Sequence, residues 1–223
     1  MSSQPVRVAS IGLGWWSDVL ADAAKRSKKV EIVACFTRTE DKRRAFAEKY
    51  GCRAVSTYEE ILAADDVDAI INTTPNQTHL ETVRAAAQAG KHTFLDKPIA
   101  TTIADGRGII QACKDAGVLL AVGYQRRREN HFRWIRDKIA AGDFGNVVQA
   151  EANISRDREG KFDTGSWRFS AAGMPGGVML QIGVHYTDVL EMLLGPVKSV
   201  SGMTAQLALP GENPDVAGLL MQH

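Results

Sequence analysis

The chain has 223 residues, 44% hydrophobic and 24% charged, which is the composition of an ordinary globular protein with one large domain or two small ones. Its 27 lysines and arginines nearly balance 26 aspartates and glutamates, and the net charge of +1 argues against a non-specific nucleic-acid binder. No segment approaches about 18 continuous apolar residues and the N-terminus has no apolar signal region, so we expect a cytoplasmic protein with no membrane partner.

The first half of the chain alternates short apolar runs with helical patterns. These runs lack a polar–apolar alternation, which is typical of strands buried on both faces of a parallel sheet. Repeated strand–helix alternation predicts an α/β, doubly wound domain that ends near residue 123. The predicted strands are 6–11, 30–36, 69–72, 92–95 and 118–122, and the predicted helices are 16–26, 40–50, 77–89 and 103–116.

From residue 124 onward the pattern changes to that of an α+β domain. Helices are predicted over 132–141 and 184–194, and strands of an antiparallel layer over 147–154, 197–209 and 216–221. One face of that sheet is expected to be open to solvent or to a partner. Because the chain stops inside the last strand and a two-strand sheet is rarely stable alone, we expect this domain to be incomplete, or completed by partner contacts.

A glycine-rich turn, Gly12-x-Gly14-x-x-Ser17, joins the first predicted strand to the first predicted helix. In this setting the first glycine permits the tight turn, the second lets a diphosphate approach the backbone, and the third position sets helix–strand packing. The turn therefore predicts dinucleotide binding, with serine tolerated in third place. Trp15 and Trp16 are candidate cofactor contacts, although packing at the domain junction is the alternative for at least one of them.

The end of the second predicted strand sets the nucleotide preference. An acid there would bind the ribose 2′-hydroxyl of NAD, whereas an arginine suits the 2′-phosphate of NADP. Between Phe36 and Glu40 there is no acid, and Arg38, with Thr37 and Arg43, slightly favours NADP over NAD. The alternative for Arg38 is an exposed loop charge.

The third predicted strand is followed by Thr74-Pro75-Asn76 and, after two further residues, His79. Asn76 can bond the nicotinamide ribose or cap the next helix. His79 is either a cofactor contact or an ordinary residue in the first turn of that helix.

The strand over 92–95 is followed by Asp96-Lys97-Pro98. Ligands of open parallel sheets bind outside the carboxyl ends of the strands, where the strand order reverses. A lysine there directs its ammonium toward the cofactor, and the proline restricts the backbone that aims it. The alternative is a surface lysine beside a turn proline.

A second group of candidate residues lies in the segment 175–185, in which glycines precede a helix. Gln181 and His185 are four residues apart, so on a helix they share one face about one turn apart. Oxidation of a hydroxyl needs a base near neutral pH, and histidine suits that task. A purely structural histidine is the alternative.

Together these motifs resemble the glucose–fructose oxidoreductase/inositol dehydrogenase (Gfo/Idh/MocA) family over the whole chain. The resemblance implies a Rossmann domain over 1–123, and over 124–223 a domain for substrate binding and homo-oligomer contacts through its open antiparallel sheet. It also implies a nicotinamide cofactor and a sugar, cyclitol or cyclic diol as substrate. The segments that carry it are Gly12-Leu13-Gly14, Thr74-Pro75-Asn76 with His79, Gly90-Lys91-His92 through Asp96-Lys97-Pro98, Trp167-Arg168, and Gly176-Gly177 through His185.

The resemblance implies reversible hydride transfer between an alcohol carbon and the nicotinamide. Lys97 would bond the reacting oxygen, His185 would take the hydroxyl proton and Gln181 would orient the substrate. Further candidate substrate contacts are Arg126, Trp167 and Arg168. Candidate cofactor contacts are Gly12, Gly14, Trp15, Trp16, Thr37, Arg38, Thr74, Pro75, Asn76, His79, Asp96, Lys97 and Gln125.

Three departures from the family pattern stand out. Asp96 replaces the family's glutamate, and Gln181 replaces the aspartate that many members have. Glutamine cannot accept a proton, and its neutrality removes a negative neighbour that would raise the pKa of His185. The chain is also shorter than usual for the family.

Two other functions are compatible with these motifs. One alternative is a redox-neutral enzyme that holds its dinucleotide tightly, and the other is a non-catalytic dinucleotide-binding or assembly module. No metal site is predicted, because Cys35, Cys52 and Cys113 have no metal-type spacing. Cys35 and Cys113 lie in apolar segments and are expected to be reduced packing residues.

Overall fold

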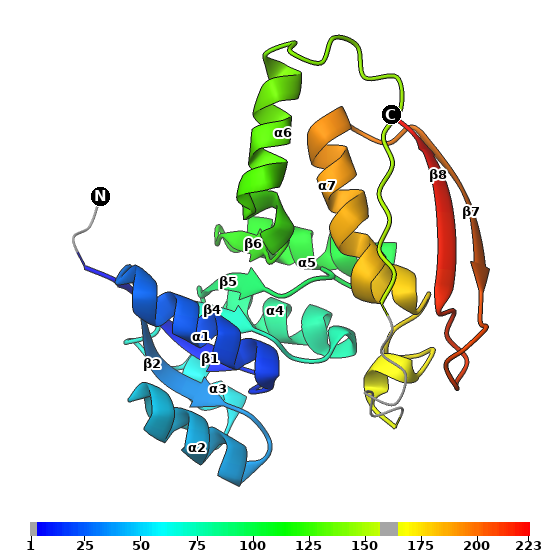
Figure 1. The fold of residues 1–223 in the computed structure, drawn as a ribbon. Helices are drawn as coiled ribbons and strands as arrows, with labels where there is room; N and C mark the ends of the chain where they lie inside the picture. The colour runs from blue at the N-terminus through cyan, green and yellow to red at the C-terminus, as the bar shows by residue number, and fades with distance from the viewer. Residues whose placement is uncertain (1–3, 157–164) are drawn as a thin grey trace. The chain divides into compact units, whose positions relative to one another are not determined.

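The computed structural model describes residues 4–156 and 165–223 (Figure 1). The chain divides into two compact units, Met1–Gly123 and Tyr124–His223. No helix in the described ranges is both long enough and apolar enough to cross a membrane.

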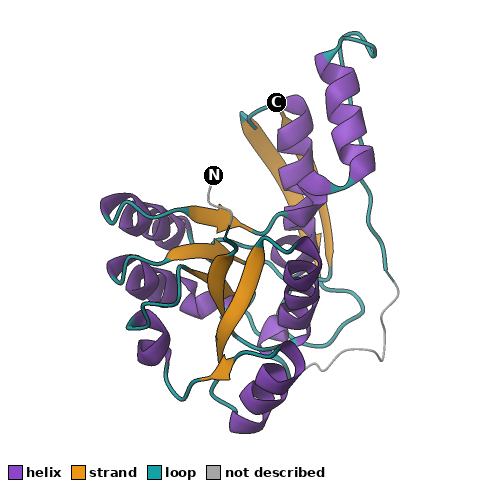
Figure 2. Cartoon of the chain, turned by 90° about the vertical axis from the view of Figure 1, so that its left-hand side faces the viewer, coloured by secondary structure: helices purple, strands orange, loops and turns teal. Residues whose placement is uncertain are grey.

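The first unit is a six-stranded parallel sheet with helices on both faces (Figure 2). Its strand order, β3-β2-β1-β4-β5-β6, is that of a doubly wound fold, which confirms the predicted fold class. The strands are β1 (Val6–Ile11), β2 (Val30–Phe36), β3 (Arg53–Ala54), β4 (Ala69–Asn72), β5 (His92–Leu95) and β6 (Leu120–Val122). The helices are α1 (Trp15–Ser27), α2 (Glu40–Tyr50), α3 (Tyr58–Leu62), α4 (His79–Gln88) and α5 (Ile103–Asp115), and the 3₁₀ turn η1 (Asn76–Thr78) precedes α4.

The chain order of the strands reverses at β1. This strand pairs with β2 on one side and with β4 on the other, so that Ile11 lies opposite both Phe36 and Asn72. The carboxyl ends of β1, β2 and β4 therefore meet at one edge of the sheet, which is where a doubly wound fold binds its ligand.

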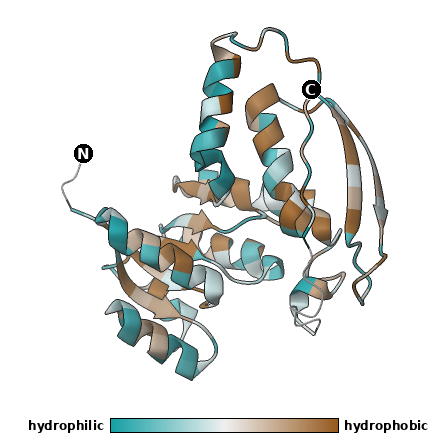
Figure 3. Ribbon diagram, in the orientation of Figure 1, coloured by the Kyte–Doolittle hydropathy of each residue, from teal (hydrophilic) through white to brown (hydrophobic). Residues whose placement is uncertain are grey.

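The buried strands supply the core on both faces of this sheet. Ala34 and Cys35 are successive residues of β2, so their side chains point to opposite faces, and each belongs to a separate apolar cluster. Figure 3 shows β2 as hydrophobic, whereas α2 mixes polar and apolar residues as expected of a surface helix. Cys35 and Cys113 are buried free thiols, as the sequence predicted.

Two short elements of this unit were not predicted. Strand β3 has two residues, and α3 has five and begins with a capping box between Thr57 and Glu60. Segments this short show no periodicity, although the Thr-x-x-Glu spacing was a local signal for a helix start.

The second unit contains helices α6 (Asn130–Ala140) and α7 (Val184–Leu194) and one antiparallel strand pair. Strands β7 (Ser199–Ala205) and β8 (Val216–Gln222) pair from Ser199–Gln222 to Ala205–Val216. One face of the pair exposes apolar side chains, with Met203 82% and Leu220 78% accessible, as expected of an open sheet. The remaining turns are η2 (Gln125–Arg128), η3 (Trp167–Phe169) and the π-helical turn η4 (Met179–Gly183).

The predicted strand over 147–154 was wrong. The structure places these residues in irregular backbone, and the Val148 side chain is 94% exposed. The alternating pattern is compatible with a strand, but a strand needs a hydrogen-bonded neighbour, and within the described ranges β7 and β8 pair only with each other.

Candidate cofactor and catalytic site

The turn after β1 is built so that only glycine fits its first position. Gly12 has φ +79°, and a Cβ there would lie 2.5 Å from the Thr74 nitrogen and 2.6 Å from the Thr73 carbonyl carbon. The Gly12 amide also donates to the Phe36 carbonyl at 3.1 Å. The turn is thereby held to the ends of both neighbouring strands.

The second glycine leaves space open at the start of α1. Gly14 precedes the helix in extended backbone, is exposed, and a Cβ there would meet nothing within 4 Å. The N-cap residue, Gly14, has no side chain that could cap this helix, so N–H groups of its first turn border that space. A diphosphate fits there, because the amides and the helix dipole both favour an anion.

Ser17 occupies the third position of the motif inside the protein. Its side chain is 1% exposed, and its hydroxyl donates to the Gly14 carbonyl at 2.6 Å. The serine that departs from the glycine pattern thus closes the turn with an added hydrogen bond. Of the adjacent tryptophans, Trp15 is 76% exposed and Trp16 half-buried, with ring centroids 5.4 Å apart. Their contact with the cofactor stays a prediction.

At the end of β2, two arginines are placed differently. The Arg43 guanidinium is half-buried and donates to the carbonyls of Thr37 at 3.0 Å and Arg38 at 3.5 Å. Arg38 itself is exposed, and its guanidinium makes no hydrogen bond or ion pair with any residue that the structure describes. Arg43 therefore fixes the loop that presents Arg38.

The loop after β4 is tied to the glycine turn. The Thr73 hydroxyl donates to the Gly12 carbonyl at 2.7 Å. The Asn72 side-chain oxygen accepts from the Thr74 amide at 3.1 Å and from the Thr74 hydroxyl at 2.7 Å. Pro75 is half-buried, and Asn76, which begins η1, is 5% exposed. The predicted cofactor segment Thr74–Asn76 thus lies at the switch point.

His79 begins α4 and has no exposed surface. Its Nδ1 lies 3.1 Å from the Pro98 carbonyl and 3.3 Å from that of Ile99, and its Nε2 lies 3.1 Å from the Thr74 carbonyl. Burial lowers the pKa of His79, and this effect outweighs the three carbonyl contacts, which raise it. Any influence of this ring on a cofactor would pass through the two loops that it joins.

Lys97 lies two residues beyond β5, on the sheet edge that carries the glycine turn. The Asp96 amide donates to the Asn72 carbonyl at 2.9 Å, which joins this loop to the end of β4. Asp96 and Lys97 are half-buried, Pro98 is buried, and the Lys97–Pro98 peptide is cis. The loops after β1, β4 and β5 therefore lie side by side at one edge.

In the second unit, Gln181 and His185 lie on one continuous helical segment. Gln181 is in the π-helical turn and His185 in the first turn of α7, where it is 5% exposed. Their spacing of about one turn agrees with the sequence prediction. Asp188 follows one turn later, 9% exposed, and accepts from Arg127 Nε at 2.6 Å.

The other predicted substrate contacts also belong to the second unit. The Arg126 guanidinium lies over the Tyr186 ring, 5.0 Å from its centroid, and donates to Glu129 at 3.3 Å. In η3, the Arg168 guanidinium lies 4.5 Å from the Trp167 ring centroid. These roles stay predictions, as does cofactor binding by the exposed Gln125.

Sequence reasoning missed the polar residues that support the candidate site. Asn72 and Thr73 join the loops, and Asp188, one turn after His185 on α7, pairs with Arg127 of η2. A signal existed for Asn72, because it is a polar residue at the end of an apolar strand and is only 1% exposed. Such a residue must find hydrogen-bond partners inside the protein.

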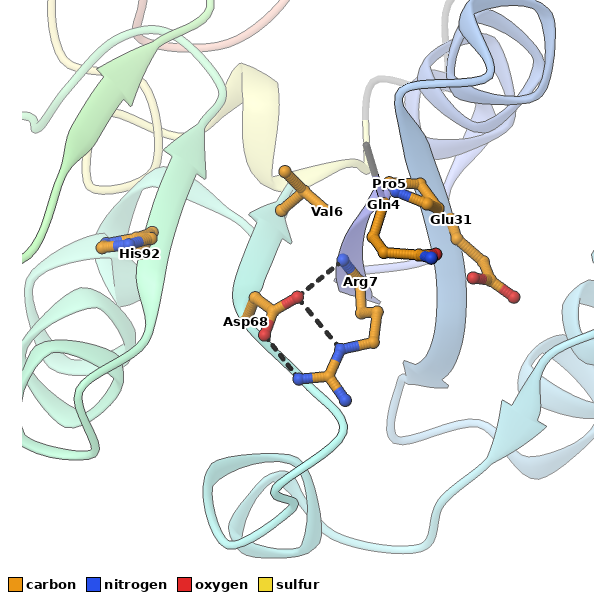
Figure 4. Close-up of a pocket in the computed structure, with 7 residues that line it drawn as sticks. All are labelled: Gln4, Pro5, Val6, Arg7, Glu31, Asp68 and His92. Carbon is orange, nitrogen blue, oxygen red and sulfur yellow. Dashed lines mark hydrogen bonds and ion pairs between the residues drawn. The ribbon is translucent and has the colours of Figure 1, made fainter. Parts of the chain in front are cut away.

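A cavity of about 610 Å³ lies at the opposite, amino-terminal edge of the sheet (Figure 4). Two of its charged side chains pair with each other: Arg7 Nη2 donates to Asp68 Oδ1 at 2.6 Å, and the hydrogen bonds from Arg7 lower the pKa of Asp68 to about 2. His92 points away from this pair and its Nδ1 accepts from the Leu119 amide. We interpret the Arg7–Asp68 pair in this cavity as a structural contact that joins β1 to the start of β4, separate from the candidate site.

Comparisons with known proteins agree with this geometry. Residues 6–124 match the model of an oxidoreductase family with an NAD-binding Rossmann fold, and residues 132–223 match the GFO/IDH/MocA C-terminal domain. The chain is 32% identical over 185 residues to 1,5-anhydro-D-fructose reductase of Ensifer adhaerens, covering 80% of this chain and 54% of that protein. It is 31% identical over 179 residues to the NADP(+)-dependent scyllo-inositol 2-dehydrogenase IolW of Bacillus subtilis, covering 80% and 48%.

A solved structure of the WlbA dehydrogenase from Bordetella pertussis, in complex with NADH and UDP-GlcNAcA, has the same fold. Its TM-score with this chain is 0.91 at 30% identity, over 100% of this chain and 64% of that one. The chain thus spans about half the length of the two curated relatives. By its matches to both family models, the chain belongs to the Gfo/Idh/MocA family of oxidoreductases.

Proposed function

We propose that the protein is an NAD(P)-dependent oxidoreductase that acts on an alcohol carbon of a sugar, cyclitol or cyclic diol. The observation that carries this proposal is the meeting of three loops at one sheet edge: the glycine turn, the Thr74–Asn76 loop and the Lys97 loop. The nicotinamide, when bound, supplies the hydride acceptor or donor. The substrate class is supported by the sugar and inositol enzymes among the relatives.

Each candidate residue then has a definite task. Gly12, Gly14 and the start of α1 hold the diphosphate, and the Lys97 ammonium stabilises negative charge on the reacting oxygen. His185 accepts the hydroxyl proton, and Gln181 hydrogen-bonds a substrate hydroxyl without taking its proton. Substrate contacts by Arg126, Trp167 and Arg168 belong to the same proposal.

Cofactor titration followed by a substrate screen tests this function. NADH and NADPH fluorescence is titrated against the intact natural protein, and sugars, cyclitols and cyclic diols are then screened by absorbance at 340 nm with the preferred cofactor. We expect binding and a substrate-dependent absorbance change. Tightly retained cofactor with product formation but no net absorbance change would instead indicate a redox-neutral enzyme, and binding without turnover across the panel a non-catalytic module.

The placement of Arg38 supports a preference for NADP. We expect Arg38→Ala to weaken NADPH binding by about 10-fold or more, because a charge-assisted hydrogen bond contributes roughly 1.5–3 kcal/mol, and to leave NADH binding unchanged. Arg44→Ala removes the same charge from an exposed position on α2 and serves as the control. Equal losses of NADPH affinity in the two variants would show that only net charge matters.

Gln181 leaves His185 without the carboxylate neighbour that an aspartate at this position would supply. Introducing a carboxylate with Gln181→Asp stabilises the imidazolium, so the base is deprotonated only at higher pH, and the rising limb of the pH–rate profile moves up by roughly one unit. The Asp188 carboxylate is already paired with Arg127, which limits how much it stabilises the imidazolium form of His185. Gln181→Asn matches the new side chain without its charge, and a shift of the same size in both variants would contradict the electrostatic explanation.

The protein's surroundings are part of the proposal. Three free cysteines support a reducing, cytoplasmic compartment. The exposed apolar residues on β7 and β8 support a homo-oligomer formed through this sheet face.

A further inference from the structure

His79 connects the two loops that flank the candidate nicotinamide site, and its hydrogen-bonding pattern is chemically unbalanced. All three main-chain atoms near its ring nitrogens are carbonyl oxygens, on Thr74, Pro98 and Ile99. A neutral imidazole has one N–H, so it can donate from one nitrogen only. Because burial lowers the pKa of this ring, the neutral form is the relevant one near pH 7.

The geometry selects which nitrogen carries the proton. Two carbonyls, at 3.1 and 3.3 Å, face Nδ1, whereas one carbonyl, at 3.1 Å, faces Nε2. A proton on Nδ1 satisfies two acceptors with one shared N–H and leaves a single lone pair facing an oxygen. A proton on Nε2 would leave two such repulsive contacts. The Nδ1–H form is therefore favoured, and its hydrogen bond goes to the segment that carries Lys97.

That segment is anchored on both sides of the lysine. On the N-terminal side the Asp96 amide donates to the Asn72 carbonyl at the end of β4. On the C-terminal side the carbonyls of Pro98 and Ile99 meet the His79 ring, which α4 holds in a fully buried position. Loss of the His79 donor would release one of these two anchors.

We propose that His79 is a positioning residue, whose Nδ1–H fixes the Pro98–Ile99 backbone and thereby the place of the Lys97 ammonium. This inference rests on the proposed function, since it is the reaction that gives the position of Lys97 its importance. A displacement of about 1 Å at a reacting group can cost about 10²-fold in rate. The diphosphate is held elsewhere, at the glycine turn, so cofactor affinity should depend little on His79.

Two substitutions distinguish the contribution of Nδ1 from that of Nε2. An asparagine amide reaches the place of Nδ1, and a glutamine amide reaches the place of Nε2. We expect His79→Asn to retain kcat within about threefold. We expect His79→Gln and His79→Ala to lower kcat by roughly 10- to 100-fold, with the dissociation constant of the reduced cofactor changed by less than about threefold.

Val67→Ala is the control for a loss of buried volume. Val67 is 2% exposed, lies just before β4 at the amino-terminal edge of the sheet, and belongs to another apolar cluster than the one that packs against Ile99. It should lower the melting temperature and leave kcat unchanged. If His79→Ala fails to fold, the comparison of His79→Asn with His79→Gln still decides the question. Equal kcat in those two variants would overturn the proposal.

A second measurement does not require turnover. Hydrogen exchange of the amides of residues 96, 97, 99 and 100 should be faster in His79→Gln than in the wild type, and close to wild type in His79→Asn. If the wild-type protein turns over no polyol, the proposed function fails, while this exchange pattern still supports the anchoring role. Unchanged exchange in His79→Gln would contradict that role whatever the activity.

Discussion

Lys97→Ala is expected to lower turnover by about 10²-fold or more while the affinity for reduced cofactor changes little. As the hydride leaves an alcohol carbon, or arrives at a carbonyl carbon, the oxygen carries negative charge, and a fixed cation in a water-poor site stabilises it. The proposed place of the diphosphate is the glycine turn after β1, so removal of the lysine should leave that part of the candidate cofactor site intact. Steady-state kinetics and a fluorescence titration measure the two effects separately.

Two controls show whether the position of the charge is what matters. Lys114→Ala removes the same charge from an exposed place near the end of α5 and should keep wild-type turnover. A small primary alkylammonium added to Lys97→Ala should restore part of the lost rate, because it supplies the missing cation. Turnover near that of the wild type in Lys97→Ala would remove the lysine from the proposed mechanism.

The second large effect is expected on stability, from Gly12→Ala. The left-handed backbone costs an alanine about 1–2 kcal/mol, and displacement of the Thr73–Thr74 backbone by the new methyl group adds roughly 1–3 kcal/mol. The free energy of unfolding should therefore fall by about 2–5 kcal/mol, measured by denaturant titration. Cofactor binding should be lost as well, since the turn and the β4 loop move together.

Substitutions at two other glycines separate the backbone cost from the steric cost and from the loss of cofactor binding. Gly51 has φ +70° but nothing within 4 Å of a Cβ, so Gly51→Ala should show only the backbone cost of about 1–2 kcal/mol. Gly14→Ala should leave stability within about 0.5 kcal/mol of the wild type and still raise the cofactor dissociation constant about 10-fold or more, because its methyl group enters the space left for the diphosphate. A Gly12→Ala protein as stable as Gly51→Ala would contradict the steric part of the argument.

The elements of the first unit could be predicted because their sequence signals are local. Four of its strands, including 6–11 and 92–95, have the predicted bounds, since each is a short run with several apolar or β-branched residues that is followed by a glycine or a polar residue. The prediction of a strand over 147–154 was wrong because it depended on a contact that is not local. The alternation in this segment describes what a strand would bury, but pairing depends on a neighbouring strand, which the local sequence does not reveal.

In the candidate site, too, local features could be predicted from the sequence and non-local contacts could not. The sequence motifs indicated Gly12, Lys97 and His185 as candidates, because glycine turns, residues after buried strands and residues at helix starts can be recognised along the chain. The anchoring contacts could not be found, because they join residues 19 and 20 positions apart through main-chain carbonyls, which every residue type possesses. Sequence placed His79 in the first turn of a helix but gave no indication that it faces the Lys97 loop.

The hydroxyl of Ser17 has a practical consequence for finding and altering such proteins. Because it is bound to the peptide oxygen three residues earlier and enclosed by its surroundings, that position selects for small side chains of which glycine is only one. Searches that insist on three glycines would overlook turns of this kind, and mutant libraries aimed at changing cofactor choice should leave residue 17 as glycine, alanine or serine.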